Sequence, residues 1–371
     1  MRYYIIAGEA SGDLHASHLV DEIKKRDASA EFRGLGGDKM KAEGVSLLKH
    51  YSETAYMGFT EVIVHLRAIL KNIENCKKDI QAWKPDAVIL VDYPGFNLRI
   101  APFAKQNGYK VFYYISPQLW AWKSSRVEII KKYVDHMFVI LPFEKEFYEK
   151  FNFEVEYHGH PLFDEIRHKI KDQEFHKRNH LSKDPIVGIL PGSRKQEISV
   201  KLPVMLKMAK QFPAFQFVVA CAPGIEKSFY ERFAADPNIY YLPNQTYDIL
   251  QHSSAALVTS GTATLETALF HVPQIVCYKG SAISYLIARR LIKVKYISLV
   301  NLIMNKEVVP ELIQFDFNET NLKAALDRLL FNDAYRTAMR DEYTMLKEKL
   351  GEDGASGRVA DSIINHLKKE D

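Results

Sequence analysis

Short apolar runs alternate with longer amphipathic segments along most of the chain. The runs are bounded by Gly, Pro or polar residues and are rich in Ile, Val, Tyr and Phe, which is typical of buried strands. They lie at residues 3–7, 85–91, 111–115 and 136–142 in the first half, and at 185–190, 215–220, 239–242, 255–259 and 274–278 in the second. Residues 32–38 are a further strand-to-glycine turn, and residues 298–303 and 308–312 close the second sheet region. Strands that alternate with helices predict βαβ units and parallel sheets, so the expected fold class is α/β.

This alternation occurs twice, with a polar, charge-dense segment from Leu162 to Asp184 between the two series. A chain of 371 residues also exceeds the length at which one hydrophobic core usually stops growing. We therefore predict two domains, residues 1–165 and 166–351. A glycine-rich stretch precedes a last helix, so residues 352–371 could pack back on the first domain.

Composition narrows the class of protein. Hydrophobic residues make up 47% of the chain and charged residues 26%, as in ordinary globular proteins. The net charge of +4 is too small to indicate nucleic-acid binding, but it suits anionic ligands or an anionic membrane surface. No apolar run approaches the roughly 18 residues of a membrane span, so we expect a protein that does not cross the bilayer.

Cysteine and histidine spacing gives no sign of a disulfide framework or a metal site. Cys76, Cys221 and Cys277 are far apart and form no Cys-x-x-Cys pair, which fits a reducing cytoplasm. His158 and His160 are not spaced like helical metal ligands, and the chain has no Asp-x-Asp motif. We therefore expect no bound divalent ion.

Two turns in the second half have the composition of phosphate-binding turns. The strand at 255–259 breaks at Ser260-Gly261-Thr262 before a helix, whose unpaired N–H groups and dipole suit a phosphate. One turn further on, Glu266 could accept hydrogen bonds from ribose hydroxyls. The alternative is a plain strand–turn–helix connection capped by Ser260. A second such turn at 190–194 favours diphosphate binding.

The first half has acidic loops instead. Glu9 and Asp13 lie in a turn with the wrong glycine spacing for a dinucleotide site, and they suit hydroxyl or amine groups of a substrate. Asp92 follows the strand at 85–91, where open α/β sheets bind ligands, and is the candidate general base. Asp92 could equally be a residue that caps the following turn. Trp120 could stack on a sugar or belong to the core.

Two segments could meet a lipid surface. The helical pattern at 56–80 is apolar around more of its circumference than a core-facing helix needs, although a well-buried helix is the favoured interpretation. Residues 282–303 form a basic amphipathic stretch that suits an anionic bilayer or, equally, an ordinary surface helix.

Six motifs follow one another in order: residues 8–13, 92–97, 116–122, 159–161, 190–194 and 260–266. Together they resemble the motifs of the lipid-A-disaccharide synthase family, and the similarity extends to about residue 311. The resemblance implies a GT-B fold, in which two Rossmann-like domains with doubly wound parallel sheets face a cleft.

The resemblance also implies an activity. The chain would be an inverting glycosyltransferase of lipid A biosynthesis, joining UDP-2,3-diacylglucosamine to 2,3-diacylglucosamine-1-phosphate (lipid X) in β-1,6 linkage and releasing UDP. It would need no cofactor or metal and bind no nucleic acid. It would work in the cytoplasm at the inner face of the membrane without spanning it; a homodimer is left open.

The motifs and the local chemistry assign the site residues. The catalytic residues are Asp92 and Arg194. The nucleotide and donor residues are Gly192, Ser193, Arg194, Ser260, Gly261, Thr262, Glu266, Asn301 and Glu311. The acceptor residues are Glu9, Ser11, Asp13, Asn97, Gln118 and Trp120. The acyl- or membrane-facing residues are Met57, Phe59, Val62, Leu66, Arg289, Arg290 and Lys293.

Three other functions compete with this interpretation. A UDP-N-acetylglucosamine transferase or epimerase would share the fold, and the apolar segment at 57–70 argues mildly against it. A non-catalytic nucleotide-binding membrane adaptor would not need carboxylates, cations and phosphate turns in one chain. A dehydrogenase would need a dinucleotide fingerprint after a strand, which is missing.

Overall fold

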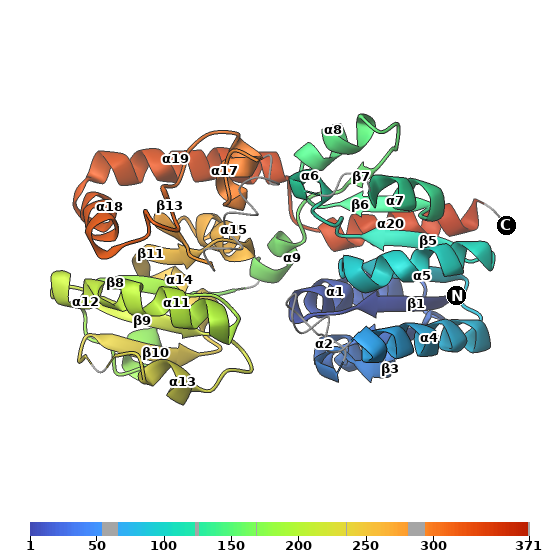
Figure 1. Ribbon diagram of the computed structural model, residues 1–371, viewed down its shortest axis with the longest axis horizontal. Helices are drawn as coiled ribbons and strands as arrows, with labels where there is room; N and C mark the ends of the chain where they lie inside the picture. The colour runs from blue at the N-terminus through green and yellow to red at the C-terminus, as the bar shows by residue number, and fades with distance from the viewer. Residues whose placement is uncertain (54–65, 123–125, 168, 235, 281–293, 370–371) are drawn as a thin grey trace. The chain divides into compact units, whose positions relative to one another are not determined.

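The computed structural model describes residues 1–371 except 54–65, 123–125, 168, 235, 281–293 and 370–371. The chain divides into two compact units (Figure 1). The first unit contains Met1–Arg167 and Leu350–Asp371, and the second contains His168–Lys349. Among the described helices, none has the length and apolar character needed to cross a membrane.

The first unit is built on a parallel sheet of seven strands in the order β3-β2-β1-β4-β5-β6-β7. The strands are β1 (Arg2–Ala7), β2 (Glu31–Gly36), β3 (Ser46–His50), β4 (Ala87–Val91), β5 (Lys110–Tyr114), β6 (His136–Val139) and β7 (Glu156–Tyr157). The pattern missed β3 and β7. Half-buried side chains in β3 and the two-residue length of β7 leave little apolar signal.

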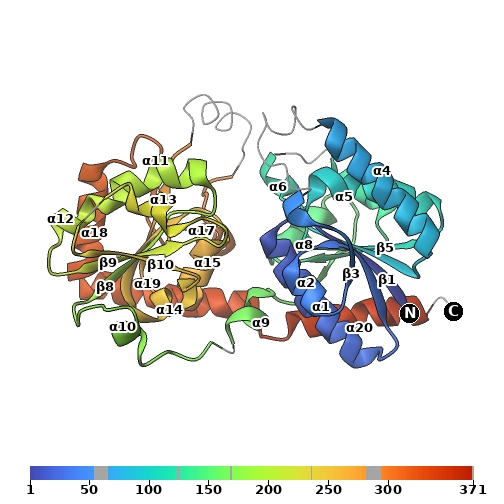
Figure 2. The same ribbon diagram turned by 90° about the horizontal axis from the view of Figure 1, so that it is seen from below.

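Helices cover both faces of this sheet (Figure 2). The helices of the unit are α1 (Ala10–Arg26), α2 (Asp38–Ala42), α4 (Leu66–Trp83), α5 (Pro94–Gln106), α6 (Leu119–Trp122), α7 (Val127–Tyr133), α8 (Phe143–Glu149), α9 (Leu162–Ile166) and α20 (Ala355–Lys368), with a 3₁₀ turn at Tyr51–Glu53. Strand β1 serves both cores, because Tyr4 packs with α4 and α5 while Tyr3 and Ile5 pack with α1 and α20.

The last helix, α20, belongs to the first unit although the second unit precedes it in the sequence. Val359, Ala360 and Ile363 enter the core beside α1. Arg26 on α1 forms an ion pair with Asp361, with Nε and Oδ1 2.6 Å apart. At the start of α20, the Asp164 carboxylate accepts hydrogen bonds from the backbone N–H groups of residues 354 and 356. The C-terminal segment thus completes one face of the first sheet.

The second unit has a parallel sheet of six strands in the order β10-β9-β8-β11-β12-β13. Its strands are β8 (Ile186–Leu190), β9 (Gln216–Cys221), β10 (Ile239–Pro243), β11 (Ser253–Thr259), β12 (Gln274–Tyr278) and β13 (Glu311–Ile313). Its helices are α10 (Phe175–Arg178), α11 (Lys195–Leu206), α12 (Met208–Gln211), α13 (Lys227–Glu231), α14 (Thr246–His252), α15 (Thr262–Leu269), α17 (Leu299–Met304), α18 (Glu319–Phe331) and α19 (Asp333–Leu350).

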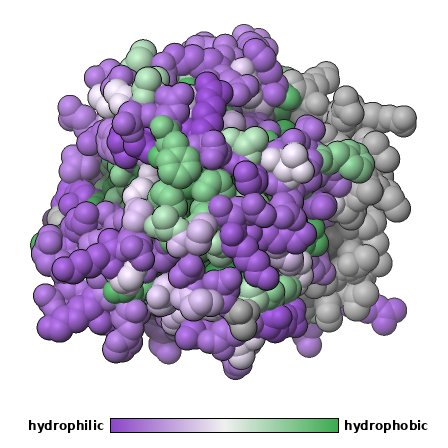
Figure 3. Space-filling view, turned by 90° about the vertical axis from the view of Figure 1, so that its left-hand side faces the viewer, coloured by the Kyte–Doolittle hydropathy of each residue, from purple (hydrophilic) through white to green (hydrophobic). Residues whose placement is uncertain are grey.

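Hydrophilic residues cover most of one face of the second unit, and hydrophobic residues gather in one small area of it (Figure 3). Exposed apolar side chains of the described chain include Phe331 at the end of α18, whose ring neighbours those of Phe212 and Phe215. A small group of exposed apolar side chains like this one is ordinary on protein surfaces.

Both sheets reverse their strand order at one point, between β1 and β4 in the first unit and between β8 and β11 in the second. The loops that leave such neighbouring strands diverge to opposite faces of the sheet and leave a crevice at the carboxyl ends, where doubly wound sheets bind ligands. Ala7 pairs with Val91, and Leu190 pairs with Val258. The α/β fold class is confirmed, and the topology brings the four predicted loops together in pairs.

Candidate active site

The loop after β4 holds Asp92 in an unusual backbone conformation. Asp92 and Tyr93 have φ angles of 45° and 47°, in the left-handed region that residues other than glycine seldom adopt. The Asp92 N–H donates to the carbonyl of Tyr114 at 2.9 Å. Its carbonyl accepts from the Tyr113 hydroxyl at 2.6 Å and from Asn97 Nδ2 at 2.8 Å. These bonds fix the backbone from which the carboxylate projects.

Gly8 allows the loop after β1 to approach this turn. A Cβ atom at position 8 would lie 2.2 Å from Cγ of Tyr93, so only glycine leaves room for that ring. The ring also stacks on Phe96, with centroids 5.3 Å apart. The next residue is Glu9, whose carboxyl group is close enough to that of Asp92 to raise the Asp92 pKa through its charge and hydrogen bonding.

The two carboxyl groups therefore form an acid pair. Burial raises the pKa of Asp92, and the charge and hydrogen bond of Glu9 raise it further, to about 7. Like charges in one site cannot both ionise easily, so Asp92 is partly protonated near neutral pH. A group with such a pKa is suited to take a proton from a hydroxyl group at physiological pH.

Two predicted acceptor residues are hydrogen-bonded to the backbone of neighbouring loops, and their contact with the acceptor stays a prediction. Asp13 is 3% exposed, and its carboxylate accepts hydrogen bonds from the backbone N–H groups of residues 37, 39 and 40 at the start of α2. Asn97 is completely buried, and its Nδ2 group donates to the carbonyls of Val91 and Asp92. Both side chains shape the loops around the acid pair and have no amide or carboxylate face turned to solvent.

The remaining acceptor residues lie near these loops in the sequence. Ser11 is exposed in the first turn of α1, and Gln118 is exposed just before α6. Trp120 packs edge-on against Phe143, with ring centroids 5.0 Å apart. Sugar stacking by Trp120 stays a prediction.

Sequence analysis missed a second buried carboxyl group, Glu144 on α8. It accepts hydrogen bonds from the N–H groups of Ile140 and Leu141. Burial raises its pKa to about 7, although these hydrogen bonds act in the opposite direction. Glu144 has the charged neighbours Lys145, Glu146 and Glu149 in the sequence, so the pattern gave no signal of its burial.

In the second unit, both predicted phosphate turns depend on glycines with positive φ. Gly192 has a φ of 118°, and an added Cβ would lie 2.7 Å from Oε2 of Glu197. Gly261 has a φ of 134° and is the N-cap of α15. The first N–H groups of a helix lack intrahelical acceptors and attract anions. Ser193 and Arg194 are exposed beside the first turn, and Thr262 is exposed at the second.

A chain of charged side chains connects the two turns. Arg194 Nη1 lies 2.9 Å from Oε1 of Glu197, and Oε2 of Glu197 lies 3.6 Å from Nζ of Lys201. Lys201 is 3% exposed and donates to the hydroxyl of Thr259, the last residue of β11. Burial lowers the pKa of Lys201, while Glu197 raises it.

Sequence analysis missed Lys201. The i,i+4 spacing of Glu197 and Lys201 on the helix after the first turn was an available signal of a paired lysine. The pairing does not by itself predict burial, because such pairs usually lie on exposed helix faces.

The other donor residues surround the second turn. The Ser260 hydroxyl donates to the Ile297 carbonyl at 2.8 Å, and Tyr247 donates to Glu266 at 3.0 Å. Glu311 accepts from the N–H groups of residues 297 and 298 and from Nδ2 of Asn301. Asn301 is completely buried, and its Oδ1 accepts from two backbone N–H groups.

Asn301 and Glu311 are therefore hydrogen-bonded within the protein. Their polar groups stabilise the segment at 297–309 and hold Ile297 against Ser260, and their direct contact with the donor stays a prediction. Their effect on the site is to position the turn at Ser260.

The predicted lipid-facing residues cannot be placed in the same way. Met57, Phe59, Val62, Arg289, Arg290 and Lys293 lie outside the described residues. Leu66 begins α4, and of the following residues Leu70 is 50% exposed.

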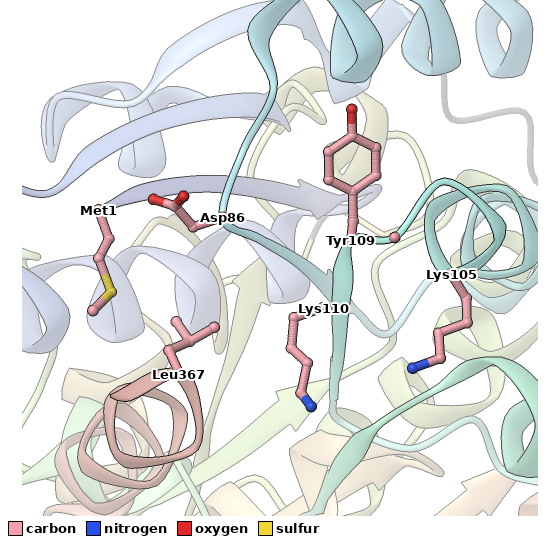
Figure 4. Close-up of a pocket in the computed structure, with 7 residues that line it drawn as sticks. Met1, Asp86, Lys105, Tyr109, Lys110 and Leu367 are labelled. Atoms are coloured by element: carbon pink, nitrogen blue, oxygen red, sulfur yellow. The ribbon is translucent and has the colours of Figure 1, made fainter. Parts of the chain in front are cut away.

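A pocket of about 470 Å³ lies elsewhere, at the amino ends of β1, β4 and β5 (Figure 4). Asp86, Lys105, Lys110 and Leu367 are among its lining residues. Since the acid pair follows the carboxyl ends of β1 and β4, this pocket is at the opposite edge of the sheet and does not belong to the predicted site.

Comparison with known proteins identifies a family. A family model described as lipid-A-disaccharide synthetase matches residues 3–362. The lipid-A-disaccharide synthase of Syntrophus aciditrophicus is 43% identical over 375 residues, which cover 99% of this chain and 98% of that protein. The enzyme of the same name from Geobacter sulfurreducens is 39% identical over 378 residues, covering 100% and 98%.

Solved structures show the fold alone. A UDP-GlcNAc 2-epimerase from Neisseria meningitidis, bound to UDP-GlcNAc, has a TM-score of 0.68 at 12% identity and covers 98% of this chain and 100% of its own. The calicheamicin glycosyltransferase CalG4 has a TM-score of 0.63 at 16% identity, covering 99% and 98%. The expected GT-B architecture of two Rossmann-like units is confirmed.

Proposed function

The chain belongs to the lipid-A-disaccharide synthase family, and from that premise we propose how its residues form the lipid A disaccharide. The reaction is a glycosyl transfer, and the family implies a UDP-sugar donor and lipid X as acceptor. We assign UDP-2,3-diacylglucosamine binding to the second unit and activation of lipid X to the first. The observation that supports this division is the charge at the two switch points, acidic in the first unit and cationic in the second.

In the first unit, Asp92 is the proposed general base. Its carboxylate takes the proton of the acceptor 6-hydroxyl while that oxygen attacks the anomeric carbon of the donor sugar. The bond from that carbon to the UDP oxygen breaks, and the configuration inverts. Positioned proton transfer of this kind contributes about 10²–10⁴ in rate.

Glu9 is the residue that sets the protonation of the base. Once Asp92 has accepted the proton, its hydrogen bond with the Glu9 side chain stabilises the neutral form. Glu9 therefore takes part through Asp92, in addition to its proposed contact with the acceptor.

In the second unit, fixed positive groups meet the negative charge that develops on the leaving diphosphate. Arg194 presents a planar fork of donors beside the first turn, and the α15 N-terminus presents backbone N–H groups. Lys201 adds a buried cation between the turns, where an anion is poorly screened by water. Glu266 is placed to hold the ribose. We infer that these groups make a catalytic metal unnecessary.

The acyl chains of both substrates place the reaction at a lipid surface. We propose peripheral binding to the cytoplasmic face of the inner membrane through the apolar residues near 57–70 and the basic residues at 289–293. The rival epimerase function is supported only by a shared fold at 12% identity, whereas relatives at 37–43% identity share one activity in name.

Incubation with the diacylated donor and lipid X, followed by mass analysis, tests the function. Wild-type enzyme should produce one disaccharide phosphate and one UDP per donor consumed. Asp92→Asn should lower turnover by about 10²–10⁴ and leave UDP affinity nearly unchanged, because the amide cannot accept the proton. Near-wild-type turnover of Asp92→Asn would refute the base assignment, and absence of product with wild-type enzyme would refute the function.

The pH dependence of kcat/KM tests the acid pair. A base must be deprotonated, so activity should fall as the pH drops through the Asp92 pKa of about 7. Glu9→Gln removes the neighbouring negative charge, which lowers the pKa of Asp92, so the acidic limb should move to lower pH. Glu144→Gln is the matched control, since its pKa is also about 7. A limb that moves in Glu144→Gln and not in Glu9→Gln would contradict the assignment.

Lys201→Met tests the buried cation. Calorimetric affinity for UDP should fall about tenfold, corresponding to about 1.4 kcal/mol. The free energy of unfolding should also fall, because the variant leaves the Glu197 carboxylate and the Thr259 hydroxyl without Lys201 as a partner, so UDP affinity is measured on protein with native circular dichroism. Lys207→Met removes an exposed lysine just after α11 and should change neither quantity. Equal UDP affinity for Lys201→Met and wild type would remove Lys201 from the donor site.

Sedimentation with vesicles tests the membrane proposal. The protein should bind vesicles that contain anionic lipid, and raising the salt from about 0.1 M to 1 M should release much of it, because the Debye length falls from about 10 Å to 3 Å. Replacing Arg289, Arg290 and Lys293 by Gln should weaken binding in low salt. No binding to anionic vesicles would reject the proposal.

A further inference from the structure

A cluster of histidines surrounds one carboxylate at the edge of the first sheet. Glu156 begins β7, and Nε2 of His366 on α20 lies 3.0 Å from its Oε1 atom. Nδ1 of His136, the first residue of β6, lies 4.0 Å from the same oxygen. One ligand atom from each of these three residues can be chosen so that all lie within 4.8 Å of one another.

The second oxygen of Glu156 is held separately. Ser362 Oγ donates to Oε2 at 2.6 Å, and Nε2 of His158 lies 2.9 Å from it. Metal-binding carboxylates are commonly fixed by such outer hydrogen bonds, which aim the free oxygen at the ion.

We propose that His136, Glu156 and His366 bind one divalent transition-metal ion, with Zn²⁺ the best match. Two imidazoles and one carboxylate are a donor set that Zn²⁺ accepts in tetrahedral geometry, with water as the fourth ligand. Mg²⁺ prefers six oxygen ligands and is a poor match. The site departs from our expectation of no metal, which the sequence could not reveal because its ligands are 20 and 210 residues apart.

The imidazole rings of His136 and His366 stack with centroids 3.5 Å apart. An ion that both rings share requires each to turn a nitrogen toward it, so binding separates the stack. The side chains are about one-quarter exposed, which leaves an ion a path from solvent. The three cysteines, in contrast, are buried and do not compete for the metal.

The position of the proposed metal site in the fold indicates a structural effect. His136 and Glu156 begin neighbouring strands, whereas His366 is on the helix that returns from the other end of the sequence. Leu367, the next residue, lines the amino-edge pocket in Figure 4, so the cluster is at the edge opposite the acid pair. A bound ion would fasten α20 to the sheet without taking part in glycosyl transfer.

Zinc titration of the chelator-treated, untagged full chain by calorimetry tests the proposal. We expect one Zn²⁺ per chain and a melting temperature that rises with Zn²⁺ and not with Mg²⁺. His366→Gln preserves a hydrogen-bond donor to Glu156 but removes a ligand, so Zn²⁺ affinity should fall at least tenfold. His136→Gln removes the ligand on β6 instead of the one on α20, and it should also lower Zn²⁺ affinity at least tenfold.

His18→Ala is the matched control. Nε2 of His18 also lies close to a glutamate, 3.4 Å from Oε2 of Glu165, but His18 is not one of the three proposed metal ligands. It should keep wild-type Zn²⁺ affinity and stoichiometry. Less than one ion bound per chain, or unchanged affinity in both glutamine variants with native circular dichroism, would overturn the proposal. A loss of binding in His18→Ala as large as in His366→Gln would overturn it as well.

Discussion

The proposed chemistry of the first unit depends on the turn at Asp92 and Tyr93, two residues that adopt a backbone conformation usually found in glycine. Asp92 and Tyr93 both take left-handed φ angles, each at a cost of about 1–2 kcal/mol. Hydrogen bonds from Tyr113 and Asn97 to the Asp92 carbonyl, and from the Asp92 N–H to the Tyr114 carbonyl, offset this cost and prevent the turn from relaxing. The Tyr93 ring lies so close to Gly8 that any side chain at position 8 would collide with it. This close approach of the two loops brings the carboxyl groups of Asp92 and Glu9 together.

The second unit repeats the topology with the opposite charge. In both sheets, a loop on either side of the strand reversal reaches the same edge, and a glycine in each pair allows close approach. The first sheet collects carboxylates there, whereas the second collects Arg194, the helix start at Gly261 and the buried Lys201. In the proposed mechanism, one architecture thus supplies a proton acceptor in one unit and anion-stabilising groups in the other, through differences in a few side chains.

Apolar periodicity was sufficient to predict the long buried strands and both strand–turn–helix junctions, because these depend on local sequence. It missed β3 and β7, whose residues are half-buried or too few. The sequence could not show that Asp13, Asn97, Asn301 and Glu311 are hydrogen-bonded within the protein. A polar residue in a site-like motif looks the same whether it faces a ligand or satisfies backbone N–H and carbonyl groups, and only tertiary structure distinguishes the two. Lys201 and the Glu156 cluster were missed because long-range packing creates them.

The position of α20 in the first unit has a consequence for how the protein is made. During synthesis, the sheet of residues 2–157 emerges from the ribosome well before residues 355–368, so the apolar surface that Val359, Ala360 and Ile363 later cover stays open to water. The second unit, contiguous in sequence, can complete its core first. Nascent chains of this architecture therefore pass through a stage in which a hydrophobic surface is exposed, as in the partly folded chains that chaperones bind, and a premature stop near residue 350 would leave that surface uncovered.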